Sequence, residues 1–398
     1  MTTTTKPRIE SIDVLRGVVM VIMALDHVRD FFHISAWTDD PLNLQTTTPA
    51  LFLTRFITHF CAPTFVFLSG TSIFLQSQRK TPDELFKFLI TRGLWLIFME
   101  LTLVALGTTF DIHFHLFVLQ VIWAIGISMI ILAFLQKTNY QTILIIGLAI
   151  VLCHNLLDIP EAAPGFKAGF WWDLLHHGSF SAQYSITKGH NLVLMYPFLP
   201  WLGIMLMGYC FGIFFTSKYT QSQRKGLFIK IGLGILAFFI VLRASNLYGD
   251  PFPWSMQDTA IKTILSFLKI NKYPPSLLYM LLTIGTAILA LAFLESIKNG
   301  FTDAMRTFGR VAFFYYLCHW FLLHSLVFIY FYANGHNQSM AVELLQTLPW
   351  LYVVPADGIS LPYVYLIWIS VIIALYPLCK WYDKYKTSHP EKWWLSYL

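Results

Sequence analysis

Long apolar stretches, separated by short polar ones, recur along the whole chain of 398 residues. A helix that spans a bilayer needs about 20 predominantly apolar residues. Ten stretches come close to or exceed this length, at residues 13–33, 51–75, 86–107, 115–135, 141–157, 191–215, 228–246, 274–294, 308–331 and 361–381. The pattern predicts an all-α fold, a polytopic transmembrane helical bundle of about ten membrane-spanning helices, which forms one domain over residues 1–398.

The composition excludes a soluble domain and the charges indicate an orientation. Hydrophobic residues make up 56% of the chain and charged residues 12%, about half the fraction of charge that is usual in soluble proteins. Most of the 27 Lys and Arg residues lie in alternate loops and near the two chain ends. The positive-inside rule therefore predicts cytoplasmic termini, with outer loops at 158–190 and 332–360. The net charge of +6 is thus an orientation signal, and no nucleic-acid partner is expected.

The first apolar stretch carries more ionisable residues than a membrane helix needs. Its outer part contains Asp26, His27, Arg29, Asp30 and His33, although each such side chain costs roughly 2.5–3.5 kcal/mol in a bilayer unless it faces protein or water. On a helix, Asp30 lies three residues from both His27 and His33, so its carboxylate can reach either imidazole. A carboxylate beside a histidine is typical of a general base. The alternative is a helix end that emerges into water, where these residues form solvated ion pairs.

Polar residues of other spans are predicted to join these histidines. The second span contains Arg55 and His59 in its outer half, with Pro63 expected to kink it, and the ninth contains His319. Histidines also collect at membrane interfaces because they are amphipathic. For His59 and His319, which lie within spans, the sequence favours a polar cavity in the outer half of the bundle.

The first helix also carries a recognisable motif. It reads R-x-x-S-I-D-x-L-R-G from Arg8 to Gly17 and is followed ten residues later by His27. This pattern resembles the opening helix of membrane acyltransferases. Together with HISAW and PTFVFLSGTSIFL it is similar to the heparan-α-glucosaminide N-acetyltransferase family. Later segments that are similar to the bacterial branch of that family are LQVIWAIG, YPFLPWLGIMLMGYCFG, YPPSLLYMLLTIG and GRVAFFYYLCHWFLLH.

The resemblance implies an enzyme of the bacterial cytoplasmic (inner) membrane. Such a transmembrane N- or O-acetyltransferase takes acetyl from cytoplasmic acetyl-CoA and delivers it to an amino sugar or glycan on the other side. The family's catalytic histidine precedes a small residue and a Trp, which matches His33 before Ala36 and Trp37, whereas the broader acyltransferase pattern places the essential histidine at His27. The chain departs from the animal enzyme at His27 and at His59, so the resemblance does not carry over the heparan substrate.

These inferences combine into a hypothesis of acyl transfer across the bilayer. His27 or His33 acts as the general base on the acceptor, or accepts the acetyl group itself, and Asp26 or Asp30 orients the imidazole. The remaining predicted residues are Arg55, His59, His319 and Trp37 for substrate and oxyanion, Arg79, Lys80, Arg306 and Arg310 at a basic cytoplasmic rim for the phosphates of CoA, and Asp13 with Arg16 as a structural charge pair.

Two other functions stay open at the level of sequence. Buried His, Asp and Arg also build proton relays, so the chain could be a proton-coupled transporter or channel for a small polar solute, although no pair of broken helices in matching positions is evident. A non-catalytic scaffold would not need the polar residues. The five scattered cysteines predict neither a disulfide framework nor a metal site. The expected partners are membrane lipid, acetyl-CoA and an extracytoplasmic sugar or glycan, and homodimerisation is left open.

Overall fold

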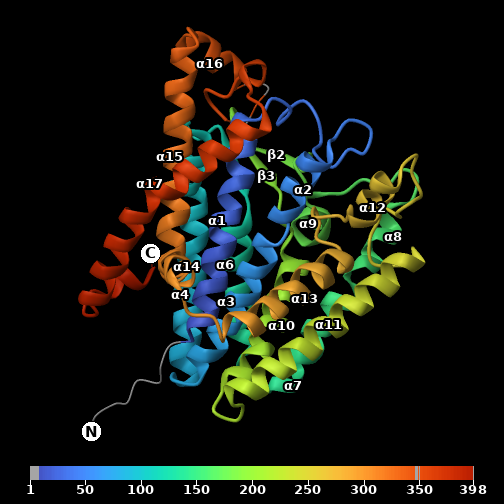
Figure 1. The fold of residues 1–398 in the computed structure, drawn as a ribbon, viewed down its shortest axis with the longest axis vertical. Coiled ribbons are helices and arrows are strands. Elements are labelled where there is room, and N and C mark those ends of the chain that lie inside the picture. Colours follow the sequence, from blue (N-terminus) through green and yellow to red (C-terminus); the bar gives the residue numbers. More distant parts are fainter. Residues whose placement is uncertain (1–8, 346–347, 349, 398) are drawn as a thin grey trace.

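The computed structural model describes residues 9–345, 348 and 350–397. Lys6 and Arg8, which contribute to the predicted orientation and to the motif, lie outside the described residues. The described chain is mainly helical, and Figure 1 shows long helices packed beside one another with a small sheet among them. Within the described residues, eight helical segments are long and apolar enough to cross a membrane. The predicted all-α polytopic bundle is therefore confirmed.

The helices that form the predicted spans follow their bounds closely. They are α1 (Glu10–Phe32), α2 (Pro49–Thr58), α3 (Cys61–Ser77), α4 (Pro82–Met99), α5 (Ala105–Thr109), α6 (Val121–Leu135), α7 (Tyr140–Cys153), α10 (Phe198–Phe211), α11 (Gln221–Ser245), α13 (Leu277–Leu294), α15 (Ala312–Ala333) and α17 (Leu361–Ser388). Two of the predicted spans fall outside the eight apolar segments, because α1 carries many charges and α6 has only 15 residues.

Shorter elements connect the spans. The short α-helices are α8 (Asp158–Glu161), α9 (Phe170–Trp172), α12 (Ala260–Leu268), α14 (Gly300–Arg310) and α16 (Gln338–Leu344). Single π or 3-10 turns are η1 (Glu100–Val104), η2 (His154–Leu157), η3 (Asp173–His177), η4 (Gly212–Phe215), η5 (Pro355–Asp357) and η6 (Trp393–Tyr397). Most of these short helices and turns lie in the segments that the sequence predicts as loops.

Two predicted spans begin with a strand instead of a helix. β1 (Leu116–Leu119) and β3 (His190–Leu194) pair in parallel, and β2 (Gln183–Thr187) pairs antiparallel with β3, so the sheet order is β1-β3-β2. The segments are apolar enough to resemble membrane helix, but extended backbone at Gln120 and at Pro197 separates each strand from the helix that follows. A hydropathy pattern without clear periodicity does not distinguish a short buried strand from the start of a helix.

The second predicted span is interrupted, as its proline predicts. Pro63 has no N–H and cannot bond the carbonyl four residues earlier, which is that of His59. α2 ends at Thr58, α3 begins at Cys61, and the Tyr279 hydroxyl donates to the His59 carbonyl oxygen at 2.8 Å. α13 thus replaces the hydrogen bond that the proline removes, and this contact fixes the break inside the bundle.

Two pairs of helices pack backbone against backbone at glycines. A Cβ on Gly17 of α1 would lie 1.7 Å from the carbonyl oxygen of Met305 in α14, and a Cβ on Gly208 of α10 would lie 2.0 Å from that of Phe67 in α3. Both distances are much shorter than a van der Waals contact, so a larger residue would push the helices apart. Close packing places α1 in the interior, against α14, α15, α17 and α3.

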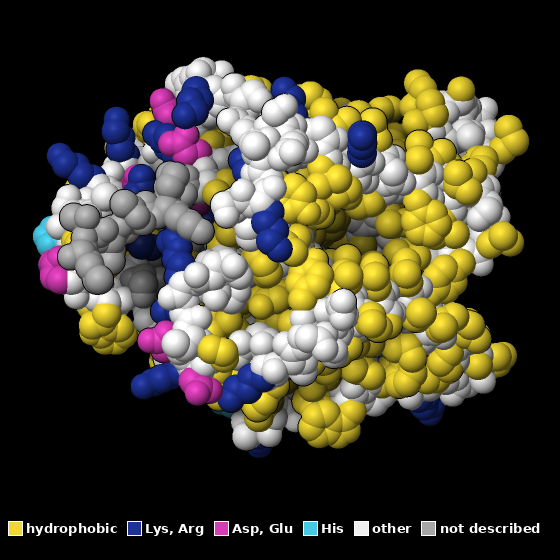
Figure 2. Space-filling view, turned by 90° about the horizontal axis from the view of Figure 1, so that it is seen from below, with side chains coloured by type: hydrophobic (Ala, Val, Ile, Leu, Met, Phe, Trp, Pro, Cys, Tyr) yellow, Lys and Arg dark blue, Asp and Glu magenta, His cyan; other side chains and the backbone are white. Residues whose placement is uncertain are grey.

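The two ends of the molecule differ. Figure 1 shows α2, β2 and α16 far from the beginning of α1. Figure 2, the view from below, shows Lys and Arg side chains gathered on one part of this face and hydrophobic side chains over the rest. A basic lower face agrees with the orientation expected from the loop charges, which itself stays a prediction.

Candidate active site

A polar cavity of about 320 Å³ lies where the outer part of α1 meets α2, β1 and the segments that precede α10 and α13. The charged side chains that line it are Asp26, Arg29, Asp30, Asp39, Asp40, Arg55 and Lys272. The aromatic side chains that line it are Trp37, Phe65, Phe180, Tyr196, Tyr273, Tyr316, Trp320 and Trp350. His27 is its only histidine among the described residues. The cavity occupies the half of the bundle in which the sequence predicts one.

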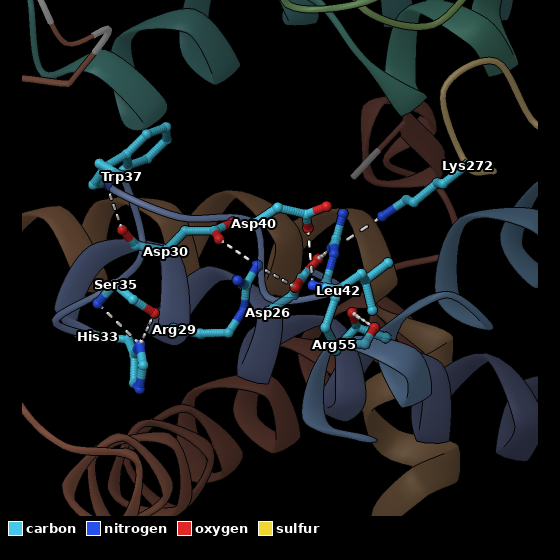
Figure 3. Close-up of polar contacts among 11 residues, drawn as sticks. Asp26, Arg29, Asp30, His33, Ser35, Trp37, Asp40, Leu42, Arg55 and Lys272 are labelled. Atoms are coloured by element: carbon cyan, nitrogen blue, oxygen red, sulfur yellow. Dashed lines mark hydrogen bonds and ion pairs between the residues drawn. The ribbon is translucent and has the colours of Figure 1, made fainter. Parts of the chain in front are cut away.

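Asp26 stands at the centre of an ion-pair network. Its carboxylate lies 3.0 Å from Arg29 Nη2 and 3.8 Å from Lys272 Nζ, and it accepts a hydrogen bond from Arg55 Nη1. Figure 3 shows Arg55 and Lys272 approaching Asp26 from other elements of the fold. A buried charge is strongly destabilising unless opposite charge and hydrogen bonds compensate it. The network therefore explains how α1 keeps its charges inside the bundle, and it anchors α2 to α1.

Asp30 has different partners from those that its spacing predicts. Its carboxylate accepts a hydrogen bond from Arg29 Nη2 at 2.6 Å, and its carbonyl oxygen accepts one from Trp37 Nε1 at 2.8 Å. The predicted contact with an imidazole is replaced by the ion pair, because the Arg29 side chain turns toward the two carboxylates beside it. Asp30 still lines the cavity, and its contact with Trp37 orients that ring.

His27 pairs with His319. The Nδ1 atom of His27 lies 2.7 Å from the Nε2 atom of His319, and the His27 ring stacks on Trp320 with 4.0 Å between centroids. One nitrogen of the pair must donate while the other accepts. His319 is fully buried, so the pair joins α1 to α15 at the cavity wall. Of the predicted histidines, these are the two that the structure brings together.

His33 lies one residue beyond α1 and is not among the residues that line the cavity. Its Nδ1 accepts a hydrogen bond from the Ser35 backbone N–H at 3.2 Å and contacts the Ser35 hydroxyl at 3.0 Å. Figure 3 shows the imidazole directed away from Asp26 and Arg55. The neighbouring backbone is fixed by a bond from Ile359 N–H to the Phe32 carbonyl oxygen at 2.7 Å.

His59 is buried beside the network but outside the cavity lining. Among the described residues neither of its ring nitrogens has a hydrogen-bond partner. Its ring meets that of Tyr279 edge to face, with centroids 5.5 Å apart. The structure therefore places His59 behind the cavity wall, close to Arg55 in sequence and in space.

Aromatic residues from distant segments close the outer side of the cavity. Trp37 and Trp350 are in ring contact at 3.9 Å between centroids, and Phe180 contacts Trp350 at 6.4 Å. These residues come from the segment after α1 and from the predicted outer loops 332–360 and 158–190. The two loops thus contribute side chains to the site, and flat aromatic faces beside carboxylates suit the apolar and polar sides of a sugar ring.

The residues predicted near the cytoplasmic face lie far from the cavity lining. Arg16 Nη1 is 3.0 Å from Asp13 Oδ1, so the predicted charge pair is present in the structure. Arg306 pairs with Glu10 and Asp303, each at 2.9 Å, and Arg310 pairs with Asp383 at 3.1 Å. Lys80 lies over the Phe88 ring at 5.4 Å, and Arg79 lies two residues beyond the end of α3. Acidic neighbours therefore neutralise part of the rim predicted to bind phosphate.

Two buried carboxylates shape the strand that forms one cavity wall. Glu100 accepts hydrogen bonds from the Gln120 and Trp123 backbone N–H groups at 3.3 and 3.0 Å, which fixes the beginning of α6. In the turn before β1, burial acts to raise the pKa of Asp111, but backbone N–H groups of His115 and His113 donate to its carboxylate, and the net effect is a pKa below the ordinary value.

Sequence reasoning missed several residues of the cavity. Lys272, Tyr273, Phe180 and Trp350 lie in outer segments that have no helical periodicity to relate them to α1. Lys272 could have been noticed as a lysine at an outer helix end, next to a Tyr-Pro-Pro sequence. Its distance from Asp26 in the chain, however, leaves the ion pair visible only in the folded protein.

The arrangement can perform acid–base chemistry on a polar substrate. His27 faces the cavity and is supported by a second imidazole, and the cationic side chains of Arg55 and Lys272 lie where they can attract developing negative charge. Asp39 and Asp40 also line the cavity. Their carboxylates are negatively charged, so they suit a cationic or hydroxyl-rich ligand.

A comparison with known families matches the greater part of the chain. Residues 8–241 match the family described as heparan-alpha-glucosaminide N-acetyltransferase, catalytic. The matched region contains His27, His33 and Arg55, and it ends before Lys272 and His319. No curated protein matches the chain.

Proposed function

Because the chain belongs to the heparan-α-glucosaminide N-acetyltransferase catalytic family, as the motif of its first helix predicts, we propose that it moves acetyl from cytoplasmic acetyl-CoA to an extracytoplasmic acceptor. The family is one of membrane acetyltransferases, and the eight apolar helices are those of an integral membrane protein. The acyl donor, the amino-sugar or glycan acceptor and the location in a bacterial cytoplasmic membrane belong to the proposal.

One observation carries the proposal: a histidine faces a polar cavity at the outer ends of the helices. His27 lines this cavity and is 2.7 Å from His319, while α1 continues to the basic lower face of the molecule. A site in the outer half suits an acceptor that arrives from outside. The donor is expected to approach from the opposite face, where Arg79, Lys80, Arg306 and Arg310 would hold its phosphates.

The chemistry is a direct acyl transfer with His27 as general base. A neutral acceptor amine attacks the thioester carbonyl, so that a C–N bond forms and the C–S bond breaks. The proton that leaves the amine passes to His27 and then to the departing thiolate, and the products are an acetamide and free CoA. The imidazolium that forms transiently is supported by His319, and Arg55 or Lys272 supplies positive charge for the oxyanion.

His33 is the alternative base. The resemblance to the family favours it, whereas its position outside the cavity lining and its contacts with Ser35 favour His27. We assign the role of general base to His27. His33 instead has a structural role at the end of α1, where the segment 332–360 contacts this helix.

Proteoliposomes test the proposed function. Labelled acetyl-CoA is added outside vesicles that enclose glucosamine, and labelled N-acetylglucosamine is expected inside. Treatment with hydroxylamine distinguishes the products, because it releases acetyl esters and leaves acetamides intact. Proton-coupled accumulation of a solute without consumption of acetyl-CoA would contradict the proposal and favour a transporter.

A further inference from the structure

A second hollow of about 470 Å³ lies beside the polar cavity and is lined by apolar side chains. The residues that line it are Ile97, Leu101, Phe117, Leu119, Trp123, Ile186 and Leu192. They come from α4, η1, α6 and all three strands of the sheet. We call this hollow the apolar groove. Among the described residues, it is lined by no charged side chain and by none of the residues of the polar cavity.

Strand β1 forms the wall between the polar cavity and the apolar groove. Val118 lines the cavity, whereas its two neighbours Phe117 and Leu119 line the groove. This alternation follows from strand geometry, because successive side chains point to opposite faces of a sheet. Phe117 pairs with Leu192 of β3 in the sheet, so the groove extends from β1 to the next strand. The polar and apolar hollows therefore lie back to back across one strand.

The groove is continuous with the surface that faces lipid. On α4, Leu94 and Phe98 flank Ile97 and are each 56% exposed. They belong to a candidate membrane span, Pro82–Thr109, where an exposed apolar side chain contacts hydrocarbon. Ile186, on the other side of the groove, is 55% exposed. A hydrocarbon chain in the outer part of the bilayer can thus reach the groove from the side of α4.

We propose that the acceptor is lipid-anchored: its sugar occupies the polar cavity, and its hydrocarbon chain passes around β1, an edge strand of the sheet, into the apolar groove. The inference rests on the proposed acetyl transfer, which it deepens by naming the class of acceptor. A glycolipid has a polar part and an apolar part. The polar cavity and the apolar groove match these two parts, and a single strand separates them. Because the chain comes from the hydrocarbon of the bilayer, its contribution to binding is van der Waals packing in the groove, and it keeps the acceptor in the plane of the membrane.

Two acceptors that differ only in their aglycone provide the test. Hexadecyl glucosaminide has the chain, and methyl glucosaminide lacks it. The quantity to compare is the ratio of their kcat/KM values, measured with purified protein in liposomes. Partition into the membrane raises the ratio by itself, so the effect of substitutions on the ratio decides the question.

The matched substitutions are Ile186→Trp, which fills the groove, and Ile240→Trp in α11, which enlarges an equally exposed isoleucine outside the groove. We expect Ile186→Trp to lower the ratio at least tenfold and Ile240→Trp to keep it within about twofold, as one well-filled apolar pocket is worth roughly 10-fold or more in specificity. An equal ratio in wild type and Ile186→Trp overturns the lipid-anchored acceptor, while acetylation of the methyl glucosaminide leaves the proposed function intact.

A photoreactive chain gives a readout that needs no turnover. Hexadecyl glucosaminide with a diazirine near the middle of its chain is expected to label peptides that contain residues 97–101, 117–123 and 186–192, and free hexadecyl glucosaminide should compete. Label spread evenly over the lipid face, or reduced equally by phospholipid, overturns the proposal. Absence of acetyl transfer to both acceptors would instead overturn the proposed function.

Discussion

Asp26 shows at the scale of single residues why α1 is polar. Three cationic side chains surround one carboxylate, and they belong to α1, α2 and the segment before α13. Each of these charges would be unfavourable alone in a bilayer, but together they compensate one another. The ion pairs fix the elements around the cavity, so that His27 is held in a defined position next to Trp320 and His319.

At the scale of single residues, we predict that substitutions of His27 and His33 differ in their effect on the rate of acetyl transfer. His27→Ala should lower kcat about 10²–10⁴-fold, as expected for loss of a general base, whereas the loss in His33→Ala should be at least tenfold smaller. Both variants are to be checked for folding by thermal unfolding in detergent before acetyl transfer is measured. A loss in His33→Ala equal to or larger than that in His27→Ala would move the base to the end of α1.

At the scale of elements, glycine contacts decide how closely the helices approach. Gly208 of α10 meets the backbone of α3, whereas a Cβ on Gly234 of α11 would have nothing within 4 Å. The two positions look alike in the sequence, since both are glycines within apolar helices. Only the packing distinguishes a glycine that is required from one that is not.

This difference predicts opposite effects of the same substitution. Gly208→Ala should lower the free energy of unfolding by about 1–3 kcal/mol, because the new methyl group forces α10 away from α3. Gly234→Ala should leave it unchanged or raise it by up to about 1 kcal/mol, since alanine favours the helix. Thermal unfolding of the two variants in the same detergent checks both, and equal effects would show that α3 and α10 are not in such close contact.

At the scale of the whole molecule, the charge of the loops and the position of the cavity lead to one orientation. Positive loops are expected in the cytoplasm, and the polar cavity lies among the segments on the opposite side. The donor and the acceptor would then reach the same site from different compartments. Val118 of the sheet, Phe180 and Trp350 line the outer side of this cavity.

Labelling of introduced cysteines checks the orientation. In intact cells a membrane-impermeant maleimide should react with Lys167→Cys, in an outer loop, and not with Lys218→Cys, in an inner one. Both positions are exposed in the structure, and the exposed Cys153 is first replaced by Ser. Disruption of the cells should make the second position reactive. The reverse pattern of labelling would mean that the protein has the opposite orientation in the membrane. An external acceptor could then not reach the cavity.

The sequence alone determined the class of fold, the approximate spans and the charged character of α1, because hydrophobic length and the cost of buried charge act locally along the chain. It could not reveal that LFVL and HNLVL are strands, since pairing joins segments far apart in the chain. The same reason explains the site. His27, Asp26 and Arg55 were recognisable from their placement in apolar spans. The pairing with His319, the approach of Lys272 and the turning away of His33 depend on tertiary packing, which alone decides which polar groups share one cavity.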